Sequence, residues 1–323
     1  TAEQKAGISK ELNDWFDVKF EESLQLSPIR MTFLGRKDLN DKIDCFTREC
    51  GDANLARQKA AVDEMKAKFN YEDLSDADKL SWDLFEYQYN QAAEAAKFRY
   101  NGFIYDQMTG PQGFVPQFLI SFHRVDDAGD MRAYVSRIRE SARALEEATA
   151  VARENAEHGT HAPKFAYEGV IDQSKKVITG APFTDGEDSA LMADVKSELA
   201  TLVADGKLTQ EDADAILADA TDAMTGVFKT AFENIIAFAT EDMANSPDSS
   251  QAVGAFLQPD GPAYYNERLA NNTTTSMTAD EIHNIGLAEV ERLHKEMEAI
   301  KDKVGFEGTL QEFFTFQRDS KDD

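Results

Sequence analysis

The stretch DAGDMRAYVSRIRESARALEEATAVARENAEHGTHAP, residues 127–163, decides the fold class. Its apolar residues recur with the 3.6-residue period of an amphipathic α-helix and do not show the strict alternation of a strand. Asp127 is a suitable N-cap, and Gly159 and Pro163 should end the helix. The residues expected on the buried face are Met131, Val135, Ile138, Ala142 and Leu145.

The rest of the chain shows the same helical period, and no segment of strand length alternates convincingly. A first helix should end before Ser27-Pro28, because a residue that precedes proline avoids the helical region. N-caps are expected at Ser75, Thr209 and Thr278. The apolar stripes include Leu12, Trp15, Phe16, Phe20 and Leu24 in the first helix, Leu80, Leu84, Phe85 and Tyr89 after Ser75, and Phe228, Phe232 and Ile236 after Thr209. We therefore predict an all-α fold, a large array of long amphipathic helices, with residues 1–323 as a single helical unit.

The charge of the chain excludes two classes of partner. Its 60 acidic and 34 basic residues give a net charge of −26, which repels both nucleic-acid phosphates and anionic lipid surfaces. No apolar run is long enough to be a transmembrane segment.

Cys45 and Cys50 lie in an expected loop, where a disulfide is feasible but not required. A bridge would favour the cell envelope.

Two of the five histidines lie in TADEIHNIGLAEVERLHKEM, residues 278–297. His283 and His294 are eleven residues apart, so a helix holds them roughly 16 Å apart and they cannot share a metal ion. Glu291 and His294 could meet, but a carboxylate-bridged metal pair needs a second Glu-x-x-His helix, which the chain lacks. We interpret Glu291 and His294 as an ordinary surface pair.

Glu289 is the residue that the helical angles single out. It projects into the apolar stripe formed by Ile282, Ile285 and Leu293, so we expect it to be buried and to have a partner. A structural ion pair and a position in the wall of a functional cleft both remain open.

The other histidines offer no catalytic centre. His158 and His161 follow a helix end, and we expect a solvated pair there, because no Cys or Asp partner is near them in sequence. His123 should be a packing or capping residue. No histidine is followed by glutamate, so H-E-x-x-H is absent. The chain itself is thus expected to hold neither catalytic residues nor a metal.

Three segments carry a resemblance to a known family: ELNDWFDVKFEESLQLSPIRMTFLG (11–35), YDQMTGPQGFVPQFLISFHRVDDAGDMRAYVSRI (105–138) and GPAYYNERLANNTTTSMTADEIHNIGLAEVERLHKEMEAI (261–300). In these segments the chain resembles the N-terminal half of the bacterial family called domain of unknown function 885. The resemblance implies a helical protein similar to zinc metallopeptidases, located in the cell envelope or periplasm. Its lipid anchor would be attached through an N-terminal signal that is removed.

The family's metal motif belongs to its C-terminal half, so we expect the polypeptide to continue beyond residue 323 and zinc to be bound only by the full-length protein. No metal ligand carries over to this chain. The family-like positions that do carry over, as candidates for the wall of a substrate cleft, are Gln107, Gln112, Tyr265, His283 and Glu289.

Two functions remain open from the sequence. The chain could be the substrate-enclosing half of a zinc peptidase, inactive alone, whose missing half supplies the metal and a general base. It could instead be a non-catalytic helical envelope lipoprotein or binding protein. A peptide is the expected ligand of the first.

Overall fold

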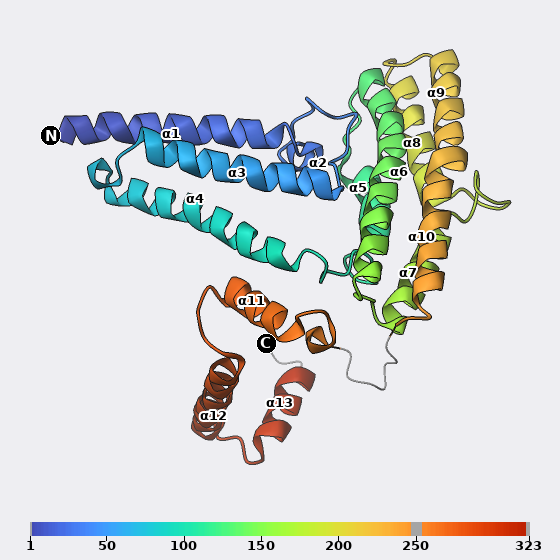
Figure 1. The fold of residues 1–323 in the computed structure, drawn as a ribbon. Coiled ribbons are helices and arrows are strands. Elements are labelled where there is room, and N and C mark those ends of the chain that lie inside the picture. Colours follow the sequence, from blue (N-terminus) through green and yellow to red (C-terminus); the bar gives the residue numbers. More distant parts are fainter. Residues whose placement is uncertain (1, 247–253, 321–323) are drawn as a thin grey trace. The chain divides into compact units, whose positions relative to one another are not determined.

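The computed structural model describes residues 2–246 and 254–320, and Figure 1 shows them to be helical. An isolated parallel bridge between Ala181 and Asp188 is the one piece of strand-like pairing in the described residues. The predicted all-α fold is therefore confirmed. The chain separates into two compact units, Thr1–Gly261 and Pro262–Asp323, each of which is described by itself. The single helical unit expected from the sequence stays a prediction.

The first unit begins with an arm of long helices, α1 (Ala2–Leu24), α3 (Arg48–Lys68) and α4 (Asp76–Ala95), with the short α2 (Pro28–Phe33) after α1 (Figure 1). Ser75 caps α4 as predicted, because its side chain accepts a hydrogen bond from the Asp78 backbone N–H. The tip of the arm is closed by a small core of buried side chains: Leu12, Trp15, Ala61, Met65, Phe69, Leu74 and Trp82.

The expected apolar stripe on α4 needs a correction. Leu80 and Leu84 are exposed, whereas Trp82 is buried in the arm. The helical period was predicted correctly, but the packed face of α4 is centred on Trp82 rather than on the two leucines. A helix with apolar residues on more than one side leaves some of them in solvent when only one side meets a neighbour.

The remaining helices of the first unit form a bundle: α5 (Pro111–Phe122), α6 (Ala128–Glu157), α7 (Lys164–Val177), α8 (Ala190–Ala204), α9 (Gln210–Ala223) and α10 (Lys229–Asp242). A π-helical segment, η3 (Met224–Phe228), joins α9 to α10. Asp127 and Thr209 cap α6 and α9 as predicted. The whole predicted face of α6 is buried in the main core.

Residues 34–47 form a strap that ties the arm to α6 of the bundle. Arg137 of α6 is fully buried under this strap. Its guanidinium donates to the carbonyl oxygen of Lys42 at 3.0 Å and to the Thr32 hydroxyl at 2.6 Å. A five-donor guanidinium suits this task, because several backbone acceptors would otherwise be left unpaired. Burial lowers the pKa of Arg137 to about 10, so it remains charged at neutral pH.

His123, which follows α5, completes the buried contact, as the sequence predicted for a packing histidine. Arg137 can only donate, so the His123 Nδ1 atom, 3.0 Å from its Nη1 atom, must accept. The His123 Nε2 atom therefore carries the proton and donates to the carbonyl oxygen of Asp130 at 3.0 Å. Burial lowers the pKa of His123 to about 4 and keeps the ring neutral.

The bridge between Cys45 and Cys50, which the sequence left open, is present and joins the end of the strap to the first turn of α3. Cys45 precedes the helix, so the pair avoids the helical geometry that would keep two such cysteines apart.

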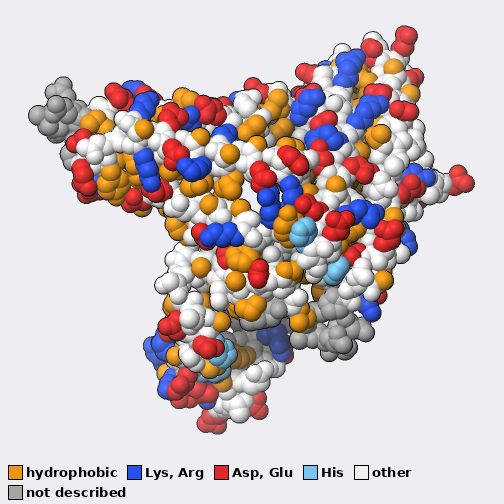
Figure 2. All heavy atoms as spheres, in the orientation of Figure 1, with side chains coloured by type: hydrophobic (Ala, Val, Ile, Leu, Met, Phe, Trp, Pro, Cys, Tyr) orange, Lys and Arg blue, Asp and Glu red, His pale blue; other side chains and the backbone are white. Residues whose placement is uncertain are grey.

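Figure 2 shows acidic and basic side chains intermixed on the visible surface, and hydrophobic side chains also reach the surface along the arm.

The second unit contains α11 (Gly261–Thr273), α12 (Ala279–Lys303) and α13 (Leu310–Asp319). The Thr278–Glu281 capping box is present at the start of α12, as predicted. Phe313 is buried and its ring lies 5.2 Å from that of Phe306. No residue of α12 is buried. In the part of the chain that the structure describes, no helix is long and apolar enough to cross a membrane.

Candidate functional site

One concave surface of the first unit is a groove between α3 and α4, whose outer part is also lined by residues of α1 and α2. It consists of two hollows, of about 300 Å³ and about 340 Å³, and Gln58 of α3 lines both. The α3 residues along it recur at helical spacing: Arg48, Asp52, Leu55, Gln58, Ala61 and Val62. The facing residues of α4 are Phe85, Gln88, Tyr89 and Ala92, and Ala96 follows directly after its end. One face of each helix thus lines the whole groove.

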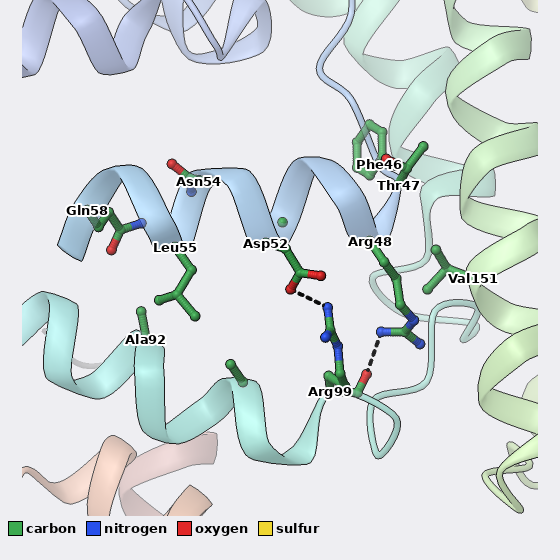
Figure 3. Close-up of a pocket in the computed structure, with 12 residues that line it drawn as sticks. Phe46, Thr47, Arg48, Asp52, Asn54, Leu55, Gln58, Ala92, Arg99 and Val151 are labelled. Carbon is green, nitrogen blue, oxygen red and sulfur yellow. Dashed lines mark hydrogen bonds and ion pairs between the residues drawn. The ribbon is translucent and has the colours of Figure 1, made fainter. Parts of the chain in front are cut away.

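The size of the facing side chains explains why the groove stays open. At the tip of the arm, Trp15 packs edge-to-face on Phe69 and Phe85, with ring centroids 6.3 Å and 5.4 Å apart, and these rings fill the space. Toward the bundle the large residues give way to Gly51, Ala92 and Ala96, which are too small to meet across the gap. Figure 3 shows Leu55 and Ala92 facing one another there.

The hollow nearer the bundle, which we call the inner hollow, has fixed polar walls. Arg99 pairs with Asp52 at 2.5 Å, and the Arg48 Nη1 atom donates to the carbonyl oxygen of Arg99 at 3.0 Å (Figure 3). Arg48 also pairs with Glu154 of α6, and its guanidinium lies 4.4 Å from the centre of the Tyr100 ring. These contacts hold both arginines in place.

The hollow nearer the tip, the outer hollow, has aromatic and basic walls. Its aromatic side chains are Phe16, Phe20, Phe85 and Tyr89. Lys19 is neutralised by Glu64 at 2.9 Å and by Glu22 at 3.1 Å. Hydrogen bonding to Glu64 raises the pKa of Lys19. The outer hollow therefore combines apolar contact area with donors at its edge.

The five candidate cleft residues predicted from the sequence do not line this groove. Gln107 and Gln112 are brought together through Gln173 of α7. Gln173 donates to the Gln107 carbonyl oxygen at 2.8 Å and accepts from the Gln112 side chain at 2.9 Å. Gln112 is also buried and donates to the Asp106 carbonyl oxygen at 2.6 Å. The two glutamines thus close a loop against α7, and whether they also contact a substrate stays a prediction.

The other three candidates belong to the second unit. Tyr265 lies on α11 and is half-buried, while His283 and Glu289 lie on α12 and are exposed. The expected burial of Glu289 is wrong in this structure, because 53% of its side chain is exposed. Its expected partner does exist, since Arg292 pairs with it at 2.7 Å. The angles placed Glu289 in the apolar stripe correctly, but no described element of the second unit buries that stripe.

His161 has a partner that the sequence did not reveal. Its Nδ1 atom lies 2.9 Å and 3.1 Å from the two carboxylate oxygens of Asp242, at the end of α10. Tyr167 donates to the same carboxylate at 2.6 Å, and burial raises the pKa of this phenol. The expected solvated pair is therefore wrong for His161. His158, which is exposed, stacks on Tyr100 instead. Through His161, Asp242 thus links the loop after α6 to the end of α10.

The zinc implied by the family resemblance finds no fitting donor set here. Among residues 2–246 and 254–320, no group of three or more His, Cys, Asp or Glu side chains could hold a metal ion. A catalytic zinc normally needs three protein ligands around an open position. Glu291, the acid of the suspected pair with His294, instead pairs with Lys295 at 2.6 Å. No catalytic step through zinc is derived for these residues.

Comparison with known proteins identifies the family. Residues 28–323 match the family described as "Bacterial protein of unknown function (DUF885)", and the chain belongs to this family. The match covers nearly the whole chain. No curated protein matches it.

One solved structure that is similar is that of "the putative lipoprotein from Colwellia psychrerythraea". It is 15% identical, with a TM-score of 0.76 over 97% of this chain, and at this identity the likeness establishes the fold alone. This chain spans 54% of the length of that protein.

Proposed function

We propose that the chain binds peptides in the groove between α3 and α4, as the substrate-enclosing part of an envelope protein similar to zinc peptidases. The observation that carries this proposal is the groove itself. Its aromatic floor offers contact area for apolar side chains, and the amides of Gln58 and Gln88 offer both donors and acceptors to a peptide backbone. The combination suits an extended segment with an apolar residue.

Two observations support the location in the cell envelope. The bridge between Cys45 and Cys50 is of a kind that persists in oxidising compartments. The structural relative from Colwellia psychrerythraea is described as a "putative lipoprotein". In this proposal an anchor attached outside the present residues would hold the protein at a membrane, and the acidic surface would keep the helical part in solution.

The alternative is a helical binding protein without catalysis. The described residues do not separate it from the peptidase, because the peptidase proposal places the metal-binding side chains outside them. Both readings require peptide binding, and they differ in whether a longer form of the protein holds zinc and cleaves what it binds.

Peptide binding is tested by calorimetric titration of the purified chain with a library of short peptides. Trp15 packs against the groove residue Phe85, so its fluorescence offers a second signal. We expect saturable binding by the chain without peptide cleavage. Metal analysis and the same library, applied to a form extended beyond residue 323, separate the two readings. One bound zinc with cleavage supports the peptidase, and binding without either supports the binding protein. A chain that binds no peptide contradicts both.

A further inference from the structure

The groove has a charge opposite to that of the chain. Its lining contains five basic side chains, Lys19, Arg30, Arg48, Arg57 and Arg99, and one acidic side chain, Asp52. The whole chain has a net charge of −26. Low-dielectric walls focus the field of such a cluster, so an anionic group is attracted into the groove and repelled elsewhere on the surface.

Three of these five side chains are already neutralised. Arg48 pairs with Glu154, Arg99 pairs with Asp52, and Lys19 pairs with Glu22 and Glu64. Their charges hold the arm together and are not available to a ligand. With these partners counted, five basic side chains meet four carboxylates, and the two basic side chains left without a carboxylate partner are the ones a ligand can reach.

Arg30 and Arg57 both line the outer hollow, and within the described residues their contacts are a ring, Phe20, and an amide, Asn54, rather than a carboxylate. Arg57 is half-buried, and its contact with the chain is a 2.8 Å hydrogen bond from Nη2 to the Asn54 side chain. Its Nε atom is buried without an acceptor in the described protein. A half-buried guanidinium without a counter-charge is costly, and an anionic ligand would offset that cost.

Arg30 approaches the same hollow from α2. Its guanidinium lies 5.0 Å from the centre of the Phe20 ring, which holds it beside the aromatic wall without using its hydrogen-bond donors. Arg30 and Arg57 thus present donors from two different helices to a hollow that four aromatic side chains also line. A planar carboxylate next to an apolar side chain matches this arrangement.

We infer that the outer hollow is a carboxylate subsite, in which Arg30 and Arg57 bind a carboxylate of the peptide while an apolar side chain of the same peptide contacts Phe16, Phe20, Phe85 and Tyr89. This inference rests on the proposed peptide binding. The carboxylate could be the peptide's C-terminus or an acidic side chain, and both present the same chemistry to the arginines.

The test uses the full chain and three short peptides of one length, each containing phenylalanine, titrated by calorimetry at low and at physiological salt. The first ends in a free carboxylate, the second is its C-terminal amide, and the third is an amide that carries a glutamate beside the phenylalanine. Tighter binding of the first peptide identifies the C-terminus, and tighter binding of the third identifies an acidic side chain. The subsite predicts at least about tenfold weaker binding of the plain amide.

Arg57→Gln and Arg30→Gln should each reduce the preference for the carboxylate peptides without weakening the plain amide. Arg132→Gln on α6, away from the groove, is the matched control and should leave every affinity unchanged. Neither Arg30 nor Arg57 forms an ion pair in the described chain, so both variants should keep the wild-type thermal unfolding. Equal binding of all three peptides, with no effect of Arg57→Gln, overturns the carboxylate subsite but leaves peptide binding intact. If no peptide binds, both proposals fail.

Discussion

The arm and the bundle of the first unit bury their long helices to very different extents. In the bundle, α6 alone buries fourteen residues against its neighbours. In the arm, α3, whose apolar residues are fewer and less confined to one face, buries three: Ala61, Val62 and Met65. The bundle surrounds its central helix on several sides, whereas the arm consists of α1, α3 and α4 with the short α2, and its groove stays open within the described part of the first unit. A helical face that does not pack against other helices is therefore the part of this fold that is available to a ligand.

The contrast between a packed bundle and an open arm is tested most directly by removing one large side chain from each. Phe232 of α10 is fully buried, so Phe232→Ala should lower the free energy of unfolding by about 3–5 kcal/mol, the usual cost of such a cavity. Leu84→Ala in the arm removes a half-exposed side chain and should change it by less than about 0.5 kcal/mol. Chemical denaturation measures both. Similar losses for the two variants would contradict the contrast between a packed bundle and an open arm.

The contact between the strap and α6 should make stability depend on pH. The pKa of His123 is lowered from 6.5 to about 4, so its stabilising contribution is fully present above pH 6.5 and is lost as the pH falls through about 4. Between pH 7 and pH 5 the loss should be about 2 kcal/mol. In His123→Gln this part of the pH dependence should disappear, and in the control His158→Gln, at an exposed histidine, it should persist. An unchanged pH profile in His123→Gln would refute the buried neutral ring.

The bridge between Cys45 and Cys50 should stabilise the join between the strap and α3. Closing a loop of this short length is worth about 2 kcal/mol in the chain-entropy description, so Cys45→Ser should cost about that much. Thiol titration of the unfolded, unreduced protein should find no free thiol. Two free thiols would contradict the bridge and weaken the proposed envelope location.

These sites also mark what the sequence could predict. The helix starts at Ser75, Asp127, Thr209 and Thr278 were predicted because capping depends on residues within one turn. The partner of His161 could not be predicted, since Asp242 lies 81 residues away. The groove could not be predicted from the sequence either. Small residues such as Ala92 of α4, and Ala96 just after it, are equally typical of tightly packed helices.

Glu289 shows the limit of a helical angle. Its position in an apolar stripe is a property of one helix, whereas burial requires a second element to cover the stripe. In the structure Glu289 is exposed and pairs with Arg292 on the same helix, so Glu289→Ala and Glu291→Ala should both leave thermal unfolding unchanged. A clear destabilisation by Glu289→Ala alone would restore the buried reading and would show that α12 is covered in solution.

The central claim, that the groove between α3 and α4 binds peptide, is tested most directly by filling it. Ala92 of α4 faces Leu55 across the inner hollow (Figure 3), so a tryptophan at position 92 would occupy that space. Glu94 has a 58% exposed side chain and does not line the groove, so Glu94→Trp adds the same ring outside it. Peptide titration of both variants should show binding lost in Ala92→Trp and kept in Glu94→Trp, with wild-type helix content in each. Undiminished binding by Ala92→Trp would contradict the claim.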